Sequence, residues 1–177
     1  MKNNKFAVFI ATWFYTGLIP PFILKGMAGT YGSFFSLPLV WGALWLSSNV
    51  WMGLYWVITV LILLIGLWAV PRAEIALGPR DDWGGNIKTR DQNQIVIDEV
   101  FGMLITCHYL CYLQISQLQL WFFLFVGFGF FRFFDIVKIP PTRYFDRMKN
   151  ATGVMLDDLV AGVYAYLLLG FVIVLFP

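Results

Sequence analysis

The chain has 177 residues, of which 60% are hydrophobic and only 12% are charged. Soluble domains usually contain about 25% charged residues, so this composition indicates a protein whose apolar side chains meet lipid. The net charge of +2 and the lack of a continuous basic run argue against a nucleic-acid partner. The length suits one domain.

The first expected element is a short helix over residues 6–19. It follows Lys2 and Lys5 and imitates a signal peptide. However, no small-x-small cleavage motif follows it, and Pro20-Pro21 comes directly afterwards. We therefore expect the segment to be retained as a helix.

Long uncharged stretches predict the membrane segments. The last, residues 159–177, suits one crossing of a bilayer core about 30 Å thick. Two others are too long for one crossing, and each has a polar interruption near its middle. We therefore expect helical hairpins over 34–70 and 98–134, and a last span over 157–176. The arms of both hairpins are short enough to be re-entrant, so the number of full crossings stays open.

These hairpins place the polar connector 71–94 and the loop 135–156 on one side of the membrane. Every charged residue from Lys25 onward then lies on that side. An excess of Lys and Arg marks the cytoplasmic side. Because backbone groups in lipid must bond internally, we expect an all-α fold: one integral membrane domain with helical hairpins and a C-terminal transmembrane helix.

Five carboxylates are expected at the ends of three helices on this face. Asp98 and Glu99 open the second hairpin, Asp135 closes it, and Asp157 and Asp158 open the last helix. Carboxylates near hydrocarbon are costly unless they are paired or bound to a cation, and hard oxygen ligands suit Mg²⁺. Helix capping alone explains neither the double pairs nor Asp135 near a helix C-terminus. The pattern therefore favours a magnesium site.

Basic residues are interleaved with these acids. Arg132 and Asp135 are spaced i, i+3, and Lys138 and Arg143 follow. Arginine offers phosphate a planar fork and lysine a point charge. Such residues often anchor lipid headgroups, but their mixture with acids favours a phosphate site.

The segment Gly29-Thr30-Tyr31-Gly32-Ser33 is expected to form a flexible turn just before a helix. Exposed N–H groups at such a position bind phosphate, and the hydroxyls of Thr30 and Ser33 add polar contacts. Glycine turns are also common before membrane helices, so this signal is weak without its neighbours.

Several other phosphate chemistries are excluded by the sequence. The one histidine, His108, lies in an apolar run, and neither Cys107 nor Cys111 is followed by Arg six residues later. No Asp-x-Asp pair and no loop ending in Gly-Lys-Ser/Thr is present. The two cysteines are interpreted as buried thiols, because a structural zinc site needs about four ligands. Metal-dependent chemistry on carboxylates remains.

Four ordered blocks resemble the phosphatidylglycerophosphatase A family. The blocks are Gly29 to Ser33 with Pro38; Asp91 with Ile95 to Glu99 and Gly102; Phe131 to Asp135 with Lys138, Pro141, Arg143 and Asp146; and Gly153 to Gly162. The resemblance implies an all-helical fold and magnesium-dependent hydrolysis of phosphatidylglycerophosphate to phosphatidylglycerol during phospholipid synthesis. It also implies a bacterial inner-membrane protein with its active site on the cytoplasmic face.

The chain departs from the family pattern at a few positions. Ala28 stands where the family commonly has Pro, and Ile139 interrupts the usual Lys-Pro-x-Pro. A single Gly153 stands where the family has a glycine pair, and the connector is longer than usual. Because every carboxylate is retained, these changes bear on substrate preference more than on the reaction class.

On this hypothesis the acids form the catalytic and metal site. Asp98, Glu99, Asp157 and Asp158 hold Mg²⁺, and Asp135 completes the site or orients water. Arg132, Lys138 and Arg143 neutralise the phosphate of the lipid, together with Thr30 and Ser33. The nucleophile is either metal-activated water or one of the aspartates, and the sequence does not separate these routes.

Two competing functions use similar residues. An ion or lipid transporter would use the acids as a cation site, but such acids usually lie within the span, and transporters usually show internal repeats. A lipid phosphotransferase would need an Asp-Gly-x-x-Ala-Arg block, which is missing.

Overall fold

The computed structural model describes residues 4–19, 27–81, 87–90, 92–146, 148 and 150–175, without the side chain of Asp146. The α-helices in this part of the chain are α1 (Lys5–Ala11), α2 (Ala28–Asn49), α3 (Leu54–Leu77), α4 (Ile97–Cys107), α5 (Gln117–Val137), α6 (Thr142–Asp146) and α7 (Ala151–Leu175). Two 3₁₀ helices, η1 (Thr16–Leu18) and η2 (His108–Tyr112), and one small antiparallel hairpin, β1 (Arg80–Asp81) and β2 (Ile87–Lys88), complete it. The predicted all-α fold is confirmed.

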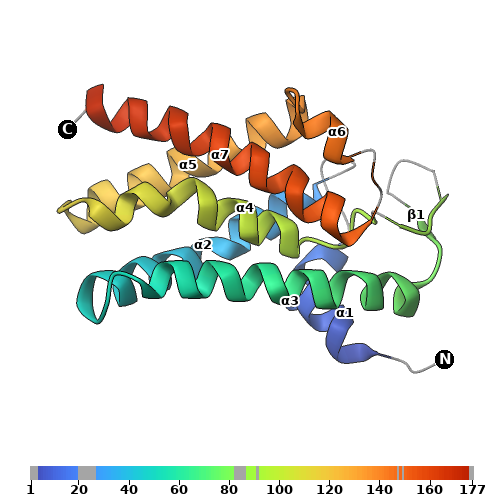
Figure 1. Ribbon diagram of the computed structural model, residues 1–177. Helices are drawn as coiled ribbons and strands as arrows, with labels where there is room; N and C mark the ends of the chain where they lie inside the picture. The colour runs from blue at the N-terminus through green and yellow to red at the C-terminus, as the bar shows by residue number, and fades with distance from the viewer. Residues whose placement is uncertain are drawn as a thin grey trace.

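The long helices lie side by side along one axis (Figure 1). One end of the bundle contains the C-terminus and the turns 50–53 and 113–116. Neither turn contains a charged residue. The β-hairpin, α6 and the start of α7 lie at the other end, which we call the polar end. The described residues between 78 and 96 and between 138 and 150 therefore lie at the same end of the bundle.

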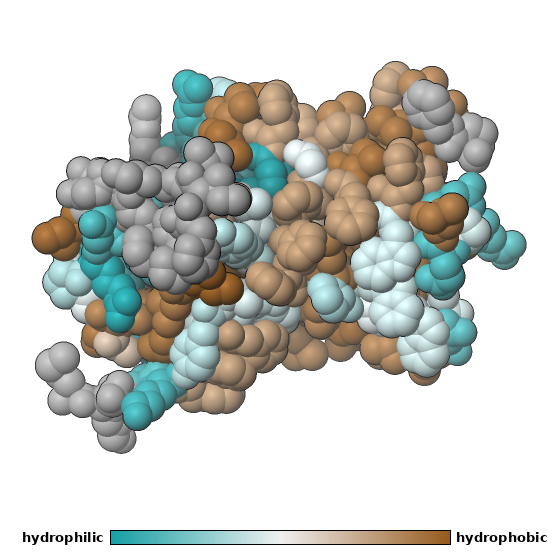
Figure 2. All heavy atoms as spheres, turned by 180° about the vertical axis from the view of Figure 1, so that it is seen from behind, coloured by the Kyte–Doolittle hydropathy of each residue, from teal (hydrophilic) through white to brown (hydrophobic). Residues whose placement is uncertain are grey.

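Three helices are long and apolar enough to cross a membrane: α3 with 24 residues, α5 with 21 and α7 with 25. Figure 2 shows hydrophobic side chains across the middle of the molecule and hydrophilic ones toward its two ends. With 11 residues, α4 reaches only about 16 Å at 1.5 Å per residue, about half the thickness of a bilayer core.

The N-terminal segment differs from the expected helix over 6–19. Helix α1 ends at Ala11, and the chain then turns through Trp13, Phe14 and Tyr15 with φ values of 46°, 58° and 67°. Long-range hydrogen bonds hold this turn: Val96 N donates to the Ala11 carbonyl (2.9 Å) and Trp13 Nε1 to the Phe35 carbonyl (3.0 Å). Tertiary bonding therefore replaces the continuous helix.

Three other helix limits differ from expectation. Helix α2 begins at Ala28, so Gly29 to Ser33 form its first turns, and the predicted flexible turn is wrong. Helix α3 continues through Pro71 to Leu77. Helix α7 begins at Ala151, where the Asn150 side chain accepts from Gly153 N (2.7 Å), so the Asp157–Asp158 pair lies well inside the helix.

Helix α4 lies at the centre and packs against α2, α3, α5 and α7. Two glycines lie where it packs against α7. A Cβ added to Gly162 would lie 2.7 Å from the Gly102 carbonyl, and one added to Gly102 would lie 3.1 Å from the Asp158 carbonyl. These glycines let the two backbones approach, which brings the start of α4 beside the acids of α7.

The variant Gly162→Ala tests this close contact. The new methyl group would meet a backbone carbonyl that cannot move without shifting α4, so we expect a loss of about 1–3 kcal/mol in unfolding free energy. Thermal unfolding in detergent measures the change. Gly170→Ala on the same helix is the control, because no atom lies within 4 Å of its added Cβ. Equal unfolding temperatures for both variants would contradict the packing role.

Candidate functional site

A cavity of about 220 Å³ lies at the polar end, where α2 and α4 begin, α5 ends and α7 runs past. The connector before α4 forms another part of its wall. The residues of the wall are Gly29, Lys88, Gln92, Asn93, Ile95, Asp98, Glu99, Arg132, Asp135, Lys138, Val154, Asp157 and Asp158.

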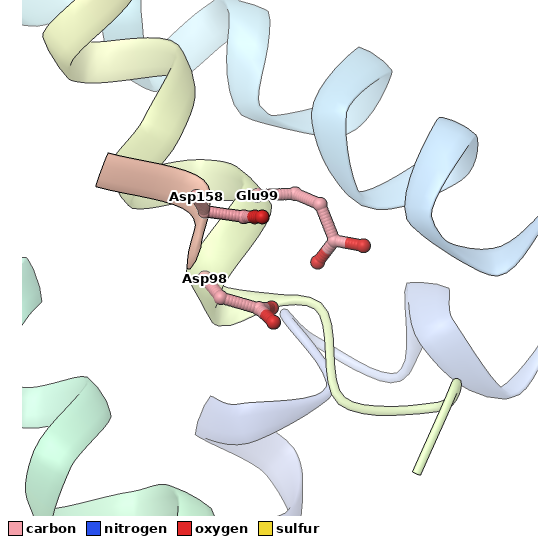
Figure 3. Close-up of side chains that lie close together, drawn as sticks. All are labelled: Asp98, Glu99 and Asp158. Carbon is pink, nitrogen blue, oxygen red and sulfur yellow. The ribbon is translucent and has the colours of Figure 1, made fainter. Parts of the chain in front are cut away.

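The five predicted carboxylates all line this cavity. Asp98 and Glu99 come from the first turn of α4, Asp135 from the last turn of α5, and Asp157 and Asp158 from α7. Asp98, Asp157 and Asp158 are only 9%, 6% and 4% exposed. Figure 3 shows the Asp98, Glu99 and Asp158 carboxylates close together where α4 and α7 meet.

The carboxylates form two overlapping groups. Ligand atoms of Asp98, Glu99 and Asp158 lie within 4.8 Å of one another, and so do those of Asp135, Asp157 and Asp158. The four predicted metal ligands are therefore divided between two groups, with Asp158 in both. Asp135 is a member of the second group, as Asp157 is.

Two basic side chains bind the acids directly. Arg132 Nη1 lies 2.7 Å from Asp135 Oδ2 and 3.9 Å from Glu99 Oε1, and Lys138 Nζ lies 2.8 Å from Asp157 Oδ2. With Lys88, the cavity wall carries three basic side chains against five carboxylates, a formal charge of −2. The site therefore favours cations over free anions.

Burial and mutual repulsion act on the acids of α4. Burial raises the pKa of Asp98 well above its usual value, and the nearby charges of Glu99 and Asp158 raise it further. Burial also raises the pKa of Glu99, while Asp98 as a hydrogen-bond partner and the charge of Arg132 lower it. A cation bound among these groups would favour their charged forms.

Several buried polar atoms have no hydrogen-bond partner among the described residues. They include Asp98 Oδ1, Glu99 Oε2 and Asp158 Oδ2, one from each member of the first group. A buried polar atom without a partner costs about 1–3 kcal/mol. Oxygen atoms of carboxylates are the ligands that a hard divalent cation prefers, so the first group fits such an ion.

The other predicted phosphate ligands are placed differently. Ser33 lies behind the wall, where its hydroxyl accepts from Arg132 Nη1 (3.4 Å) and donates to the Gly29 carbonyl (2.8 Å). Thr30 and Arg143 are not among the described residues that line the cavity. Arg143 is exposed, and its Nε donates to the Lys138 carbonyl (2.9 Å).

Two acids of the family-like blocks, Asp91 and the side chain of Asp146, lie outside the described residues. Three wall residues were missed from the sequence: Lys88, Gln92 and Asn93. Lys88 Nζ donates to Asn93 Oδ1 (3.0 Å), and Gln92 Nε2 donates to the Gly78 carbonyl (2.7 Å). The signal available was the polar run 88–94, which ends four residues before Asp98.

The sequence model of the family described as phosphatidylglycerophosphatase A matches residues 9–173. The chain belongs to the phosphatidylglycerophosphatase A family. Phosphatidylglycerophosphatase A of Haemophilus influenzae is 32% identical, with 88% of this chain and 82% of that protein covered. The protein of that name from Escherichia coli is 30% identical, with 92% and 81% covered.

A third relative has a different name. A putative phosphatidylinositol-3-phosphatase of Bacteroides thetaiotaomicron is 33% identical, with 84% of this chain and 93% of that protein covered. No solved structure matches the chain. Membership of the family confirms the predicted enzyme class, a phosphatase that acts on phosphate monoesters. Together with the three long apolar helices, these bacterial relatives identify a membrane protein.

The carboxylate groups are expected to bind a divalent cation that stabilises the folded protein. At 100 times the dissociation constant, the gain in unfolding free energy is about 2.7 kcal/mol. We expect MgCl₂ to raise the unfolding temperature of the wild type and not that of Asp158→Asn, because Asp158 belongs to both groups. Asp81→Asn, on exposed β1, is the control and should keep the increase. An undiminished increase in Asp158→Asn would contradict the assignment.

The raised pKa of Asp98 predicts how stability depends on pH in chelator. An acid with a raised pKa binds its proton more tightly in the folded state, so its contribution is lost as pH rises above the usual value of 3.8 through the raised pKa. The unfolding temperature of the chelated wild type should therefore fall over this range. Asp98→Asn should flatten the slope, and an unchanged slope would exclude Asp98 as its source.

Proposed function

We propose that this protein is a magnesium-dependent lipid phosphatase that converts phosphatidylglycerophosphate to phosphatidylglycerol and phosphate. The observation that carries the proposal is the cluster of five carboxylates with Arg132 and Lys138 around one cavity at the polar end. The names of the Haemophilus influenzae and Escherichia coli relatives support this substrate.

Asp98, Glu99 and Asp158 would hold the magnesium, because each has a buried oxygen without a partner among the described residues. When bound, the ion would withdraw charge from the phosphate and lower the pKa of a coordinated water. Asp157 and Asp135 form the adjacent group and complete the negative wall. Either a water or one of these aspartates attacks the phosphorus, and the bond from phosphorus to the lipid oxygen breaks. On the aspartate route, water then hydrolyses the phosphoaspartate, so both routes release phosphate and use the same wall.

The two basic side chains have different parts in this proposal. Arg132 is 12% exposed and already binds Asp135, so it is held in place to offer its fork to the phosphate. Lys138 is 31% exposed and its flexible amine binds Asp157. It can exchange this carboxylate for a phosphate oxygen and so neutralise charge on the phosphate as the lipid alcohol leaves.

The position of the cavity supports a lipid substrate. Helices α3, α5 and α7 span the apolar middle of the molecule, and the cavity lies at their polar end, where lipid headgroups are found. The Lys and Arg residues concentrated at this end favour the cytoplasmic face. We therefore place the enzyme in the bacterial inner membrane, in phospholipid synthesis, with its site facing the cytoplasm.

A second candidate substrate is a phosphorylated inositol lipid. The Bacteroides thetaiotaomicron relative supports it, since its name refers to a phosphoinositide. The wall of Lys88, Gln92 and Asn93 would contact the part of the headgroup beyond the phosphate. Both substrates present a phosphate monoester on a polyol, so the reaction would be the same.

Phosphate release from three substrates in detergent tests the proposal: phosphatidylglycerophosphate, a phosphatidylinositol phosphate and glycerol phosphate. We expect release from phosphatidylglycerophosphate with MgCl₂ and none with chelator. Asp98→Asn should lose activity by at least about 100-fold, because it removes a charge from the metal-binding group.

The outcomes separate the alternatives. Faster turnover of the inositol lipid would replace the proposed substrate and keep the reaction. Activity that persists in chelator would exclude the metal. A folded protein with no activity on any of the three would leave the carboxylates as the cation site of a transporter.

A further inference from the structure

Helix α2 meets the carboxylate site at Gly29, which has no side chain. Gly29 lines the cavity. A Cβ added there would overlap Glu99 Oε1 and would lie 3.0 Å from Nη1 and 3.1 Å from Nη2 of Arg132. The missing side chain therefore leaves the space in which this carboxylate and this guanidinium lie.

Two other residues of α2, Gly32 and Ser33, also contact the site or the residue before α4. Ser33, one turn after Gly29, joins the Gly29 carbonyl to Arg132 through its hydroxyl. Gly32 allows α2 to pack on Val96, since a Cβ there would lie 2.5 Å from the Val96 Cβ. Val96 directly precedes α4, the helix that carries Asp98 and Glu99. Helix α2 thus contacts Val96, the Glu99 carboxylate and the Arg132 guanidinium.

We propose that Gly29 is a positioning residue: it admits the Glu99 carboxylate and the Arg132 guanidinium to the place where Glu99 faces Asp98 and Asp158. This inference rests on the proposed function, in which Glu99 is a cation ligand. Through Gly29, the Gly-Thr-Tyr-Gly-Ser segment then determines the shape of the metal site, in addition to any contact it makes with phosphate.

The expected effect of Gly29→Ala is displacement of Glu99 with the fold retained. The atoms that its methyl group meets are the ends of two long, flexible side chains, which can move aside at low cost. Gly32→Ala is different, because the Val96 Cβ is fixed to the backbone. Gly42→Ala provides a matched control on the same helix, since no atom lies within 4 Å of its added Cβ.

The test compares wild type, Gly29→Ala and Gly42→Ala as full chains in detergent. Mn²⁺ replaces Mg²⁺, and the electron paramagnetic resonance signal of free Mn²⁺ gives the dissociation constant. For Gly29→Ala we expect about 10- to 100-fold weaker Mn²⁺ binding and a similar fall in kcat. Its unfolding temperature in chelator should stay close to that of the wild type. Gly42→Ala should match the wild type in binding and activity.

A second substitution tests the mechanism. Glu99→Asp shortens the side chain by one methylene group and makes room for the methyl group of Ala at position 29. The double variant Gly29→Ala/Glu99→Asp should bind Mn²⁺ more tightly than Gly29→Ala alone, whereas independent effects would make it weaker. A purely structural role for Gly29 would predict no such recovery.

Four other results would overturn the inference, the proposed function or both. Normal Mn²⁺ affinity in Gly29→Ala with a raised KM for lipid would overturn the inference and make Gly29 a phosphate contact. A large fall in unfolding temperature without recovery in the double variant would reduce it to packing. If the wild type binds Mn²⁺ but hydrolyses no phosphate monoester, the proposed function fails, and the Mn²⁺ affinities still decide the role of Gly29. If the wild type binds no Mn²⁺, both fail.

Discussion

The structure depends on holding five carboxylates together at the end of an apolar bundle. Asp98, Asp157 and Asp158 are at least nine-tenths buried, and burial together with the nearby charges of Glu99 and Asp158 raises the pKa of Asp98. The favourable apolar contacts lie below them, in the helices that cross the membrane. Packing must therefore supply the free energy that keeps the acids close, and the backbone that carries them must be rigid.

Helix α4 provides that rigidity by being short and almost completely buried. It contacts all four long helices, and glycine allows two of its close contacts: Gly162 against its Gly102 carbonyl, and Gly32 against Val96 just before its start. A bundle held by larger side chains would keep its helices farther apart. The short distance between α4 and α7 brings the ligand atoms of Asp98 and Asp158 within reach of one ion.

The sequence predicted the fold class and the carboxylate cluster because both follow from one constraint, the exclusion of charge from lipid. That constraint places Asp98, Asp135 and Asp158 on one face without any knowledge of packing. It says nothing about tertiary contacts, so the break in the helix after Ala11, the helical conformation of Gly29 in α2 and the wall residue Lys88 could not be predicted. Glycine in particular was interpreted as a turn former, whereas in α2 and α4 it serves close packing.

Arg132 and Lys138 show how the same charge can serve two purposes at one site. Arg132 is 12% exposed and touches Ser33 of α2, Glu99 of α4 and Asp135 of α5, so moving it would disturb three helices. Lys138 is 31% exposed and binds Asp157. Because a guanidinium keeps its proton and its planar geometry, Arg132 suits permanent neutralisation of the cluster. The more exposed amine of Lys138 can leave its carboxylate, so in the proposed reaction Lys138 is the better group to bind the phosphate as it enters and leaves the cavity.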